Sequence, residues 1–425
     1  MRRYDAELSA LLESAEAQAA HGNEGLRALR EQGIAVFREH GFPTPKNEEW
    51  KYTPLRAAAE REWRAADAGP AVFGLELPWC TDSLRVVLVN GRLDRNQLSA
   101  GGVAGLTIGS LQDAIEDGEA LSHLGKAANI EDYSFAALNT ALFEDGLYIR
   151  VAKGVHVEKT IEVVHVTCGD GQIVTPRILI VAEEGSRAKI VETYVTDGDG
   201  TNLVLPVTEV FAAKHANIEH VRIQDEGSRT FSIALWEIRQ EGDSEYRSYN
   251  IAFGGALART DQNFWLGGEH IVTRLDGIVV ATGSQLIDNH TRLDHAMPHC
   301  NSFEIYKQIV DDEATVVFNG KIFVHQDAQK TDAVQTNQAL LLSPRATINS
   351  KPQLEIFADD VKCTHGATVG QLEDAPLFYL QSRGIPADQA EGILVYAFAA
   401  EVINLITIDE VRARLEARLL EKLGG

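Results

Sequence analysis

A thiol and an imidazole lie two residues apart near the end of the chain, at Cys363 and His365, within the string 359–370. If residues 361–365 form a β-strand, both side chains project from the same face, because side chains alternate along a strand. A thiolate and an imidazole are suitable ligands for iron or zinc. Two ligands do not complete a metal site, so a second chain would have to supply the others. The spacing alone favours the alternative of a buried structural cysteine beside a hydrogen-bonded histidine.

A second group of candidate ligands lies within residues 288–300. It consists of three histidines, two carboxylates and a thiol: His290, His295, His299, Asp288, Asp294 and Cys300. These groups could form a metal site, but their spacing matches no known ligand template. Polar ladders at the turns of a repeating β-structure collect the same residue types, so we interpret the group as structural. Five further polar residues are interpreted as ordinary packing, strand or surface positions: His270, His325, Glu304, Tyr306 and Lys307.

Several motifs of catalysis are absent from the sequence. It contains no G-x-x-x-x-G-K-[ST] phosphate-binding loop, no G-x-S-x-G nucleophile elbow and no H-E-x-x-H zinc motif. Its 4 cysteines are dispersed and form no C-x-x-C pair, unlike those of a ferredoxin. If the process that the chain serves needs ATP, another chain must hydrolyse it.

The composition excludes several classes of partner. The 62 acidic and 39 basic side chains give 425 residues a formal net charge of -23. Such a surface repels nucleic acid and anionic lipid. No secretory signal follows Arg2 and Arg3, and no run of about 18 apolar residues occurs, so we expect a cytoplasmic protein without a membrane span.

The pattern along the chain divides it into three zones, and the first, residues 1–145, is expected to be mostly helical. Apolar stripes predict helices over residues 6–12 and 24–40. Three prolines make residues 42–55 an extended, irregular segment. Residues 86–89 read as a short strand followed by an Asn-Gly turn.

The second zone, residues 146–372, consists of strand-like runs separated by turn residues. Small residues follow turns at Ala188, Ala216 and Ser244, with spacings of 28 residues, and again at Ala314 and Ala346, with a spacing of 32. Repeats of this length predict a β-helix, in which each coil buries its inner face by stacking on the next. A β-sandwich is the competing interpretation, and the regular spacing favours the β-helix.

The third zone, residues 373–425, is predicted to be helical. A first helix opens at residues 374–376 and ends by Gly384. A second helix carries apolar residues at steps of three and four from Ala390 onward, and a capping box at Thr407–Glu410 introduces a third.

Long strings of the sequence resemble the SufB/SufD family of iron–sulfur cluster assembly proteins. They are residues 42–53, 320–324, 328–333, 335–337, 359–370 and 377–385. The resemblance covers essentially the whole chain, with the strings in the family's order. It is closer to SufD than to SufB members, which carry a Glu-His-Glu-Ala-Thr-like string in place of residues 363–368 and a cysteine near Asn337.

The resemblance implies a mainly β fold, a right-handed parallel β-helix core with helical N-terminal and C-terminal domains. It implies a non-catalytic scaffold in a complex with a SufB-like subunit and a SufC-like ABC-type ATPase. His365, and less directly Cys363, would face the SufB interface, where iron or a transient iron–sulfur cluster forms, with no cofactor held stably by the chain alone. Our candidates for docking the ATPase are Tyr379, Arg383, Leu394 and Phe398.

Two rival functions follow from the residues themselves. A purely structural homodimeric β-helix would need no metal chemistry. A carbohydrate-active β-helix enzyme would need a secretory signal and carboxylates grouped on one face of the solenoid, and the signal is absent.

Overall fold

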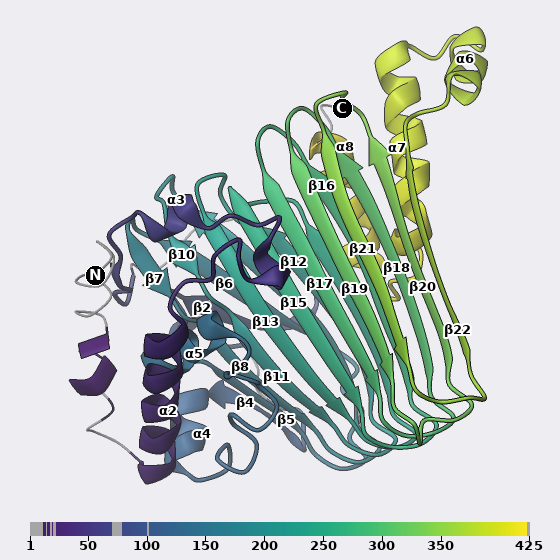
Figure 1. Cartoon of the computed structure of the whole chain (residues 1–425). Coiled ribbons are helices and arrows are strands. Elements are labelled where there is room, and N and C mark those ends of the chain that lie inside the picture. Colours follow the sequence, from purple (N-terminus) through teal and green to yellow (C-terminus); the bar gives the residue numbers. More distant parts are fainter. Residues whose placement is uncertain are drawn as a thin grey trace.

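The computed structural model describes residues 12–13, 15–17, 19, 23–69, 79–99 and 102–422. Two large sheets face each other across the inside of the solenoid, and the chain contributes one strand to each in turn as it coils (Figure 1). The solenoid has about eight turns. The prediction of a parallel β-helix is therefore confirmed, and the β-sandwich is excluded because neighbouring strands of the solenoid are parallel.

The first sheet, sheet A, has the following strands along its main path: β4 (Leu106–Ser110), β5 (Leu147–Val151), β8 (Arg177–Ala182), β11 (Val207–Ala212), β13 (Phe231–Gln240), β15 (Leu257–Leu266), β17 (Leu286–His295), β19 (Thr315–Val324) and β21 (Thr347–Ile356). Three short strands pair beside this path: β1 (Arg64–Ala65), β7 (Gln172–Val174) and β10 (Leu203–Val204). Sheet A ends at β21 on one side, and on the other β4 pairs antiparallel with β5.

The second sheet, sheet B, has these strands: β3 (Arg92–Leu93), β2 (Ser83–Val89), β6 (Thr160–Cys168), β9 (Arg187–Asp197), β12 (Asn217–Asp225), β14 (Glu245–Ala252), β16 (Val272–Ala281), β18 (Asn301–Val310), β20 (Asp332–Leu341) and β22 (Lys362–Gly370). It ends at β22 on one side. On the other, β2 turns back into β3 through Asn90 and Gly91, whose φ angles of 48° and 81° fit the predicted hairpin turn.

Several coils begin with a turn residue in the left-handed region just before a new strand. Gly185, His215, Asp243 and Asp312 all have φ between 52° and 70°. The predicted spacing from Ala188 to Ala216 does not match the pairing of the strands, however, because Ala188 lies opposite Ile218.

Two of the predicted spacings do match the register. The step from Ala216 to Ser244 agrees with it, since Ile218 pairs with Tyr246. The step from Ala314 to Ala346 also agrees, but it belongs to sheet A, where Thr315 pairs with Thr347. The sequence pattern had therefore mixed small residues from two sheets.

The inside of the β-helix is largely apolar, with paired polar groups among the apolar side chains. One large apolar cluster lines the coils from Leu84 to Ala358. Between these side chains, His220 bridges the Glu192 carboxylate, at 3.0 Å from Nε2, and the Tyr246 hydroxyl, at 2.8 Å from Nδ1. Burial opposes ionisation of Glu192, but His165 and His220 outweigh it and lower the pKa of that carboxyl. Buried polar groups of this kind are stable only because they are paired.

Helices cover the first coils. They are α2 (Glu24–His40), α3 (Arg56–Ala59), α4 (Leu111–Glu116) and α5 (Ser134–Leu142), with the 3-10 turns η1 (Glu48–Trp50) and η2 (Arg95–Gln97). The helix predicted over 24–40 is confirmed, and the Asn23 side chain caps it by accepting from Gly25 N at 2.8 Å. The helix predicted over 6–12 lies almost entirely outside the described residues.

The C-terminal helices are α6 (Asp374–Ser382), α7 (Ala387–Ile403) and α8 (Asp409–Lys422), as predicted. Helix α7 packs on the outer face of sheet B, where Glu401 pairs with Lys307 of β18 at 2.5 Å. Helix α6 projects beyond the solenoid and contains no buried residue (Figure 1). The division at residues 145 and 372 stays a prediction, and strands β1–β4 precede the first boundary.

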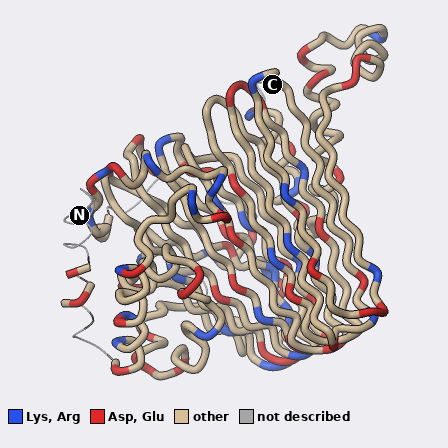
Figure 2. The backbone as a smooth tube through the Cα atoms, in the orientation of Figure 1, with Lys and Arg blue, Asp and Glu red and all other residues tan. Residues whose placement is uncertain are grey.

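Acidic and basic residues are interspersed along the strands and turns of the β-helix (Figure 2). Among the described residues, no helix is both long enough and apolar enough to cross a membrane.

Candidate functional site

The last coil of the solenoid leaves the edges of both sheets open. Strand β22 pairs with β20 on one side only, and β21 pairs only with β19. Eight of the nine residues of β22 are exposed. An unpaired strand of this length offers a row of backbone donors and acceptors to another chain.

Cys363 and His365 both lie on this last strand. Cys363 pairs in register with Ala333, and His365 with Gln335, and both partners are buried. The two side chains therefore share the inward face of the sheet, as the alternation of a strand predicts. Cys363 packs against the apolar core, and its burial raises the pKa of the thiol. His365 is exposed at the rim.

The described part of the chain contains no group of three or more His, Cys, Asp or Glu residues arranged to hold a metal ion. Cys363 and His365 thus form at most an incomplete set of ligands. An imidazole and a thiol at an open edge can still contribute to a site that a facing chain completes.

The four candidate docking residues separate into two pairs. Tyr379 on α6 and Arg383, which directly follows the helix, are both exposed, and the Arg383 guanidinium lies 4.7 Å from the centroid of the Tyr379 ring. Leu394 and Phe398 are half-buried on α7, and Phe398 lies 4.6 Å from the Lys307 ammonium of the chain's own sheet. The sequence analysis missed Phe378, whose side chain is 72% exposed. Its signal was a helix whose apolar residues form no single stripe.

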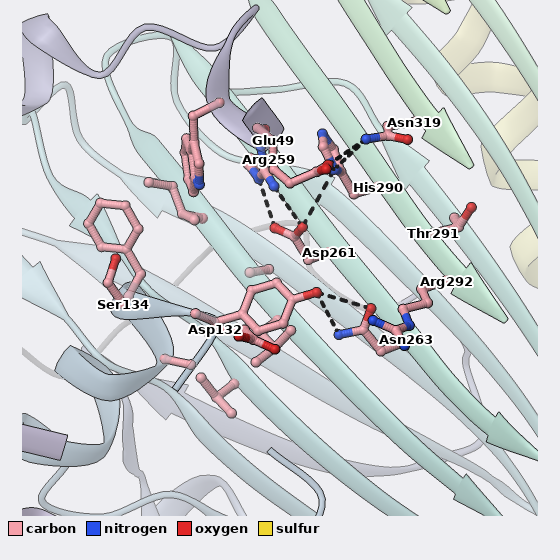
Figure 3. A pocket seen from close by; sticks show the side chains of 18 of the residues that line it. Glu49, Asp132, Ser134, Arg259, Asp261, Asn263, His290, Thr291, Arg292 and Asn319 are labelled. Carbon is pink, nitrogen blue, oxygen red and sulfur yellow. Dashed lines mark hydrogen bonds and ion pairs between the residues drawn. The ribbon is translucent and has the colours of Figure 1, made fainter. Parts of the chain in front are cut away.

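A cavity of about 320 Å³ lies against the outer face of sheet A (Figure 3). One wall is the N-terminal strap, residues 42–55, which crosses the sheet and carries η1. The opposite wall is the start of α5. The ring centroid of Trp50, in the strap, lies 3.9 Å from the guanidinium carbon of Arg259 and 5.7 Å from the ring centroid of Phe135. The prolines of the strap explain its extended course, because proline excludes the helical ladder.

Buried charges beneath the strap pair with one another. Arg259 lies between Asp261, at 2.8 Å, and Asp288, at 3.0 Å. His290 Nε2 is 3.0 Å from Asp288 and its Nδ1 is 3.4 Å from Glu49. Burial and Arg259 act to lower the pKa of His290, but Asp288 and Glu49 outweigh them and raise it to about 9. The cluster holds the strap to the sheet.

Two further bonds tie the strap down. The Thr53 hydroxyl donates to Asp288 at 2.5 Å, and Asn319 Nδ2 donates to Glu49 at 2.6 Å. Sequence reasoning missed this arrangement, although both partner segments, 42–53 and 288–300, had been noted separately.

The three histidines of residues 288–300 do not come together. His290 faces outward beneath the strap. His295 faces inward, is bonded to Ser302 at 2.9 Å, and has its pKa lowered to about 4 by burial. His299 is exposed in a turn with φ of 62°, stacked on His270. The separation of the three histidines agrees with our interpretation that residues 288–300 are structural and do not form a metal site.

Two family models match the chain. The SufBD protein N-terminal region matches residues 5–163, and the SufBD core domain of SUF system FeS cluster assembly matches residues 165–398. The chain belongs to the SufBD family.

Relatives of the SufBD family agree with this assignment. The iron–sulfur cluster assembly protein SufD of Escherichia coli is 32% identical over 93% of this chain and 92% of its own length. Protein ABCI7, chloroplastic, of Arabidopsis thaliana is 36% identical over 65% of this chain and 60% of its own. The SufD protein of Bacillus subtilis is 27% identical over 69% and 68%. The predicted resemblance is confirmed, and the chain is a SufD-like member of the SUF system.

Proposed function

We propose that the chain is the SufD-type scaffold of a SUF complex, in which its open last coil pairs with a SufB-like subunit. The observation that carries this proposal is the exposed outer edge of β22, which pairs with no other described strand, with His365 at its rim. Backbone pairing across β22 supplies affinity, as in other complexes that extend a sheet. The iron–sulfur cluster is the cargo, formed at the paired edges and not kept by this chain. The complex works in the cytoplasm.

In this proposal, His365 and Cys363 are the side chains that this chain contributes to its interface with the SufB-like subunit. The imidazole is exposed and supplies a nitrogen ligand. The Cys363 thiol is half-buried and its pKa is raised, so it stays protonated until the interface between the subunits opens or a metal ion displaces its proton. His365 is therefore the primary ligand. Cys363 becomes a ligand only after the interface opens or a metal ion displaces the proton of the thiol.

The C-terminal helices are proposed to dock a SufC-like ABC-type ATPase. Phe378 and Tyr379 of α6 are exposed apolar groups without a covering element among the described residues. Helix α7 connects this surface to β18 through Glu401 and Lys307. A movement of the ATPase would thus be passed to a strand two places from β22 in sheet B.

Co-purification tests the proposal. A tagged chain is expressed anaerobically with SufB-like and SufC-like subunits of the same organism, and the mass of the eluted complex is measured. Recovery of both partners supports the proposal, whereas recovery of a homodimer alone supports the purely structural scaffold. In the assembled complex, His365→Ala is expected to abolish most cluster formation. His299→Ala, which removes another exposed histidine in the turn before β18, outside β22, is the matched control.

A further inference from the structure

An inward-facing column of side chains runs through sheet B to its open edge. In the parallel register, Ser248 lies beside Leu275, Leu275 beside Glu304, Glu304 beside Gln335, and Gln335 beside His365. The first four are each 1% exposed, whereas His365 is exposed. The column therefore leads from the buried interior of the solenoid directly to the candidate ligand.

The amide of Gln335 is fixed in this column. Its Nε2 donates to Glu304 Oε2 at 2.7 Å, and the other carboxylate oxygen accepts from the Thr291 hydroxyl at 2.6 Å. When Glu304 is ionised, its carboxylate can only accept, so the amide turns its nitrogen toward Glu304. Gly320 provides the space, since a Cβ atom there would lie 2.3 Å from Gln335 Nε2.

The oxygen of the Gln335 amide takes no part in these hydrogen bonds. Gln335 Oε1 is buried and has no hydrogen-bond partner among the described residues. An unpaired buried acceptor costs about 1–3 kcal/mol. The next residue of the column is His365, on a strand about 4.8 Å away, so a ring N–H of the exposed imidazole reaches this oxygen by rotation of its side chain.

We infer that Gln335 is a positioning residue, whose Oε1 accepts a hydrogen bond from one ring nitrogen of His365 and leaves the other nitrogen free as a ligand. The inference rests on the role proposed for His365. Neutral imidazole carries a proton on one nitrogen and a lone pair on the other. A histidine that binds metal commonly donates its second N–H to a carbonyl or carboxylate, which fixes both its tautomer and its orientation.

The inference gives a function to two strings that the pairing of subunits leaves unexplained. Residues 320–324 supply the glycine that makes room, and residues 335–337 supply the amide. Asn337 provides a contrast on the same strand. Its amide is also buried, with Oδ1 unpaired, but its neighbour on β22 is Ala367, which has no group to bond.

The tautomer of His365 is the direct readout. Ring ¹⁵N chemical shifts of the full-length chain are recorded with labelled histidine, and the His365 signals are assigned from His365→Ala. The measurement is made above the pKa of about 7 to which burial raises Glu304. We expect one tautomer in the unmodified chain and an averaged pair of signals in Gln335→Met. The matched control, Asn337→Leu, should keep the single tautomer.

Gly320→Ala is a second variant, which retains the amide but displaces it, and it should also give averaged signals. Thermal unfolding of each variant verifies that it is folded. An averaged tautomer in the unmodified chain, or an unchanged single tautomer in both Gln335→Met and Gly320→Ala, would overturn the inference.

Cluster formation in the complex gives the functional readout. Gln335→Met is expected to lower it about tenfold, the usual effect of losing a partner behind a metal ligand, and Asn337→Leu to leave it little changed. If His365→Ala has no effect on assembly while the tautomer responds to Gln335→Met, the proposed function fails and the positioning contact stands.

Discussion

The strap-covered face of sheet A and the open last coil both present a histidine on a β-strand, yet the two regions are built in opposite ways. His290 is enclosed by Asp288, Glu49 and Arg259, and each of these charges has an opposite charge within 3.4 Å. His365 is exposed beside a buried amide oxygen that lacks a partner. The comparison shows that a fully paired set of charges stabilises the fold. An edge with an exposed histidine and an unpartnered polar atom is instead available to a partner chain.

The largest effect is expected from the centre of the covered region. Arg259→Ala leaves Asp261 and Asp288 as buried charges with one fewer cation, and should reduce the free energy of unfolding by about 3–5 kcal/mol. Urea denaturation measures this loss. Arg229→Ala, which removes an exposed arginine paired with Asp199, is the control and should change it by less than about 0.5 kcal/mol. A similar small effect for both variants would contradict the assigned role of Arg259.

The pH dependence of the same region is the next largest effect. His290 has its pKa raised from 6.5 to about 9, so its stabilising contribution is complete below pH 6.5 and is lost as the pH rises through 9. The loss should be on the order of 3 kcal/mol. Unfolding free energies measured across this range should decline in the unmodified chain and decline less in His290→Gln. Equal slopes would show that His290 is not the group responsible.

A smaller effect is expected at the strap itself. Thr53→Val keeps the shape of the side chain but removes the hydroxyl that donates to Asp288, and should cost about 1–3 kcal/mol because the acceptor is charged. Limited proteolysis should then cut the strap faster, with Thr44→Val, whose hydroxyl bonds Asn47 within the strap, as the comparison. Unchanged cleavage would mean that the remaining contacts hold the strap without Thr53.

The smallest effect on stability should come from the open coil. His365→Ala removes an exposed side chain together with its inferred hydrogen bond to Gln335, and should reduce the free energy of unfolding by about 1 kcal/mol. A calorimetric measurement on the isolated chain checks this. A large destabilisation would place His365 with His290 as a structural residue and would weaken the contrast between the two regions.

Local patterns predicted much of the fold. The stripe of α2, the Asn90-Gly91 turn and the three C-terminal helices depend on residues close in sequence, so their spacing was sufficient. The register of the coils was harder, because coil length varies: Asn217 bonds Glu245 28 residues later, whereas Glu304 bonds Gln335 31 residues later. A fixed spacing therefore linked Ala188 to Ala216, which are not neighbours in the sheet.

The candidate site was predicted only in part. Cys363 and His365 could be placed on one face from their spacing, since alternation is local. The charged cluster under the strap could not, because Arg259 meets the Glu49 carbonyl across 210 residues. Glu304 was interpreted as an ordinary strand position for the same reason. Its importance comes from Gln335 on the next coil, and only the register reveals that they adjoin.

The two ends of the solenoid differ in a way that limits assembly. At the first end, the edge strands β3 and β4 are antiparallel and have only 2 and 5 residues, whereas at the last end the edge strands β21 and β22 have 10 and 9 residues. A chain with two open ends could add further copies without limit and grow into a fibre. Because the long edge strands of the described residues lie at one end, the first pairing uses the edges best suited to a partner, and this favours a stack of two chains, whether the second is a copy or a relative. The polarity of the solenoid thus biases the stoichiometry of the pairing.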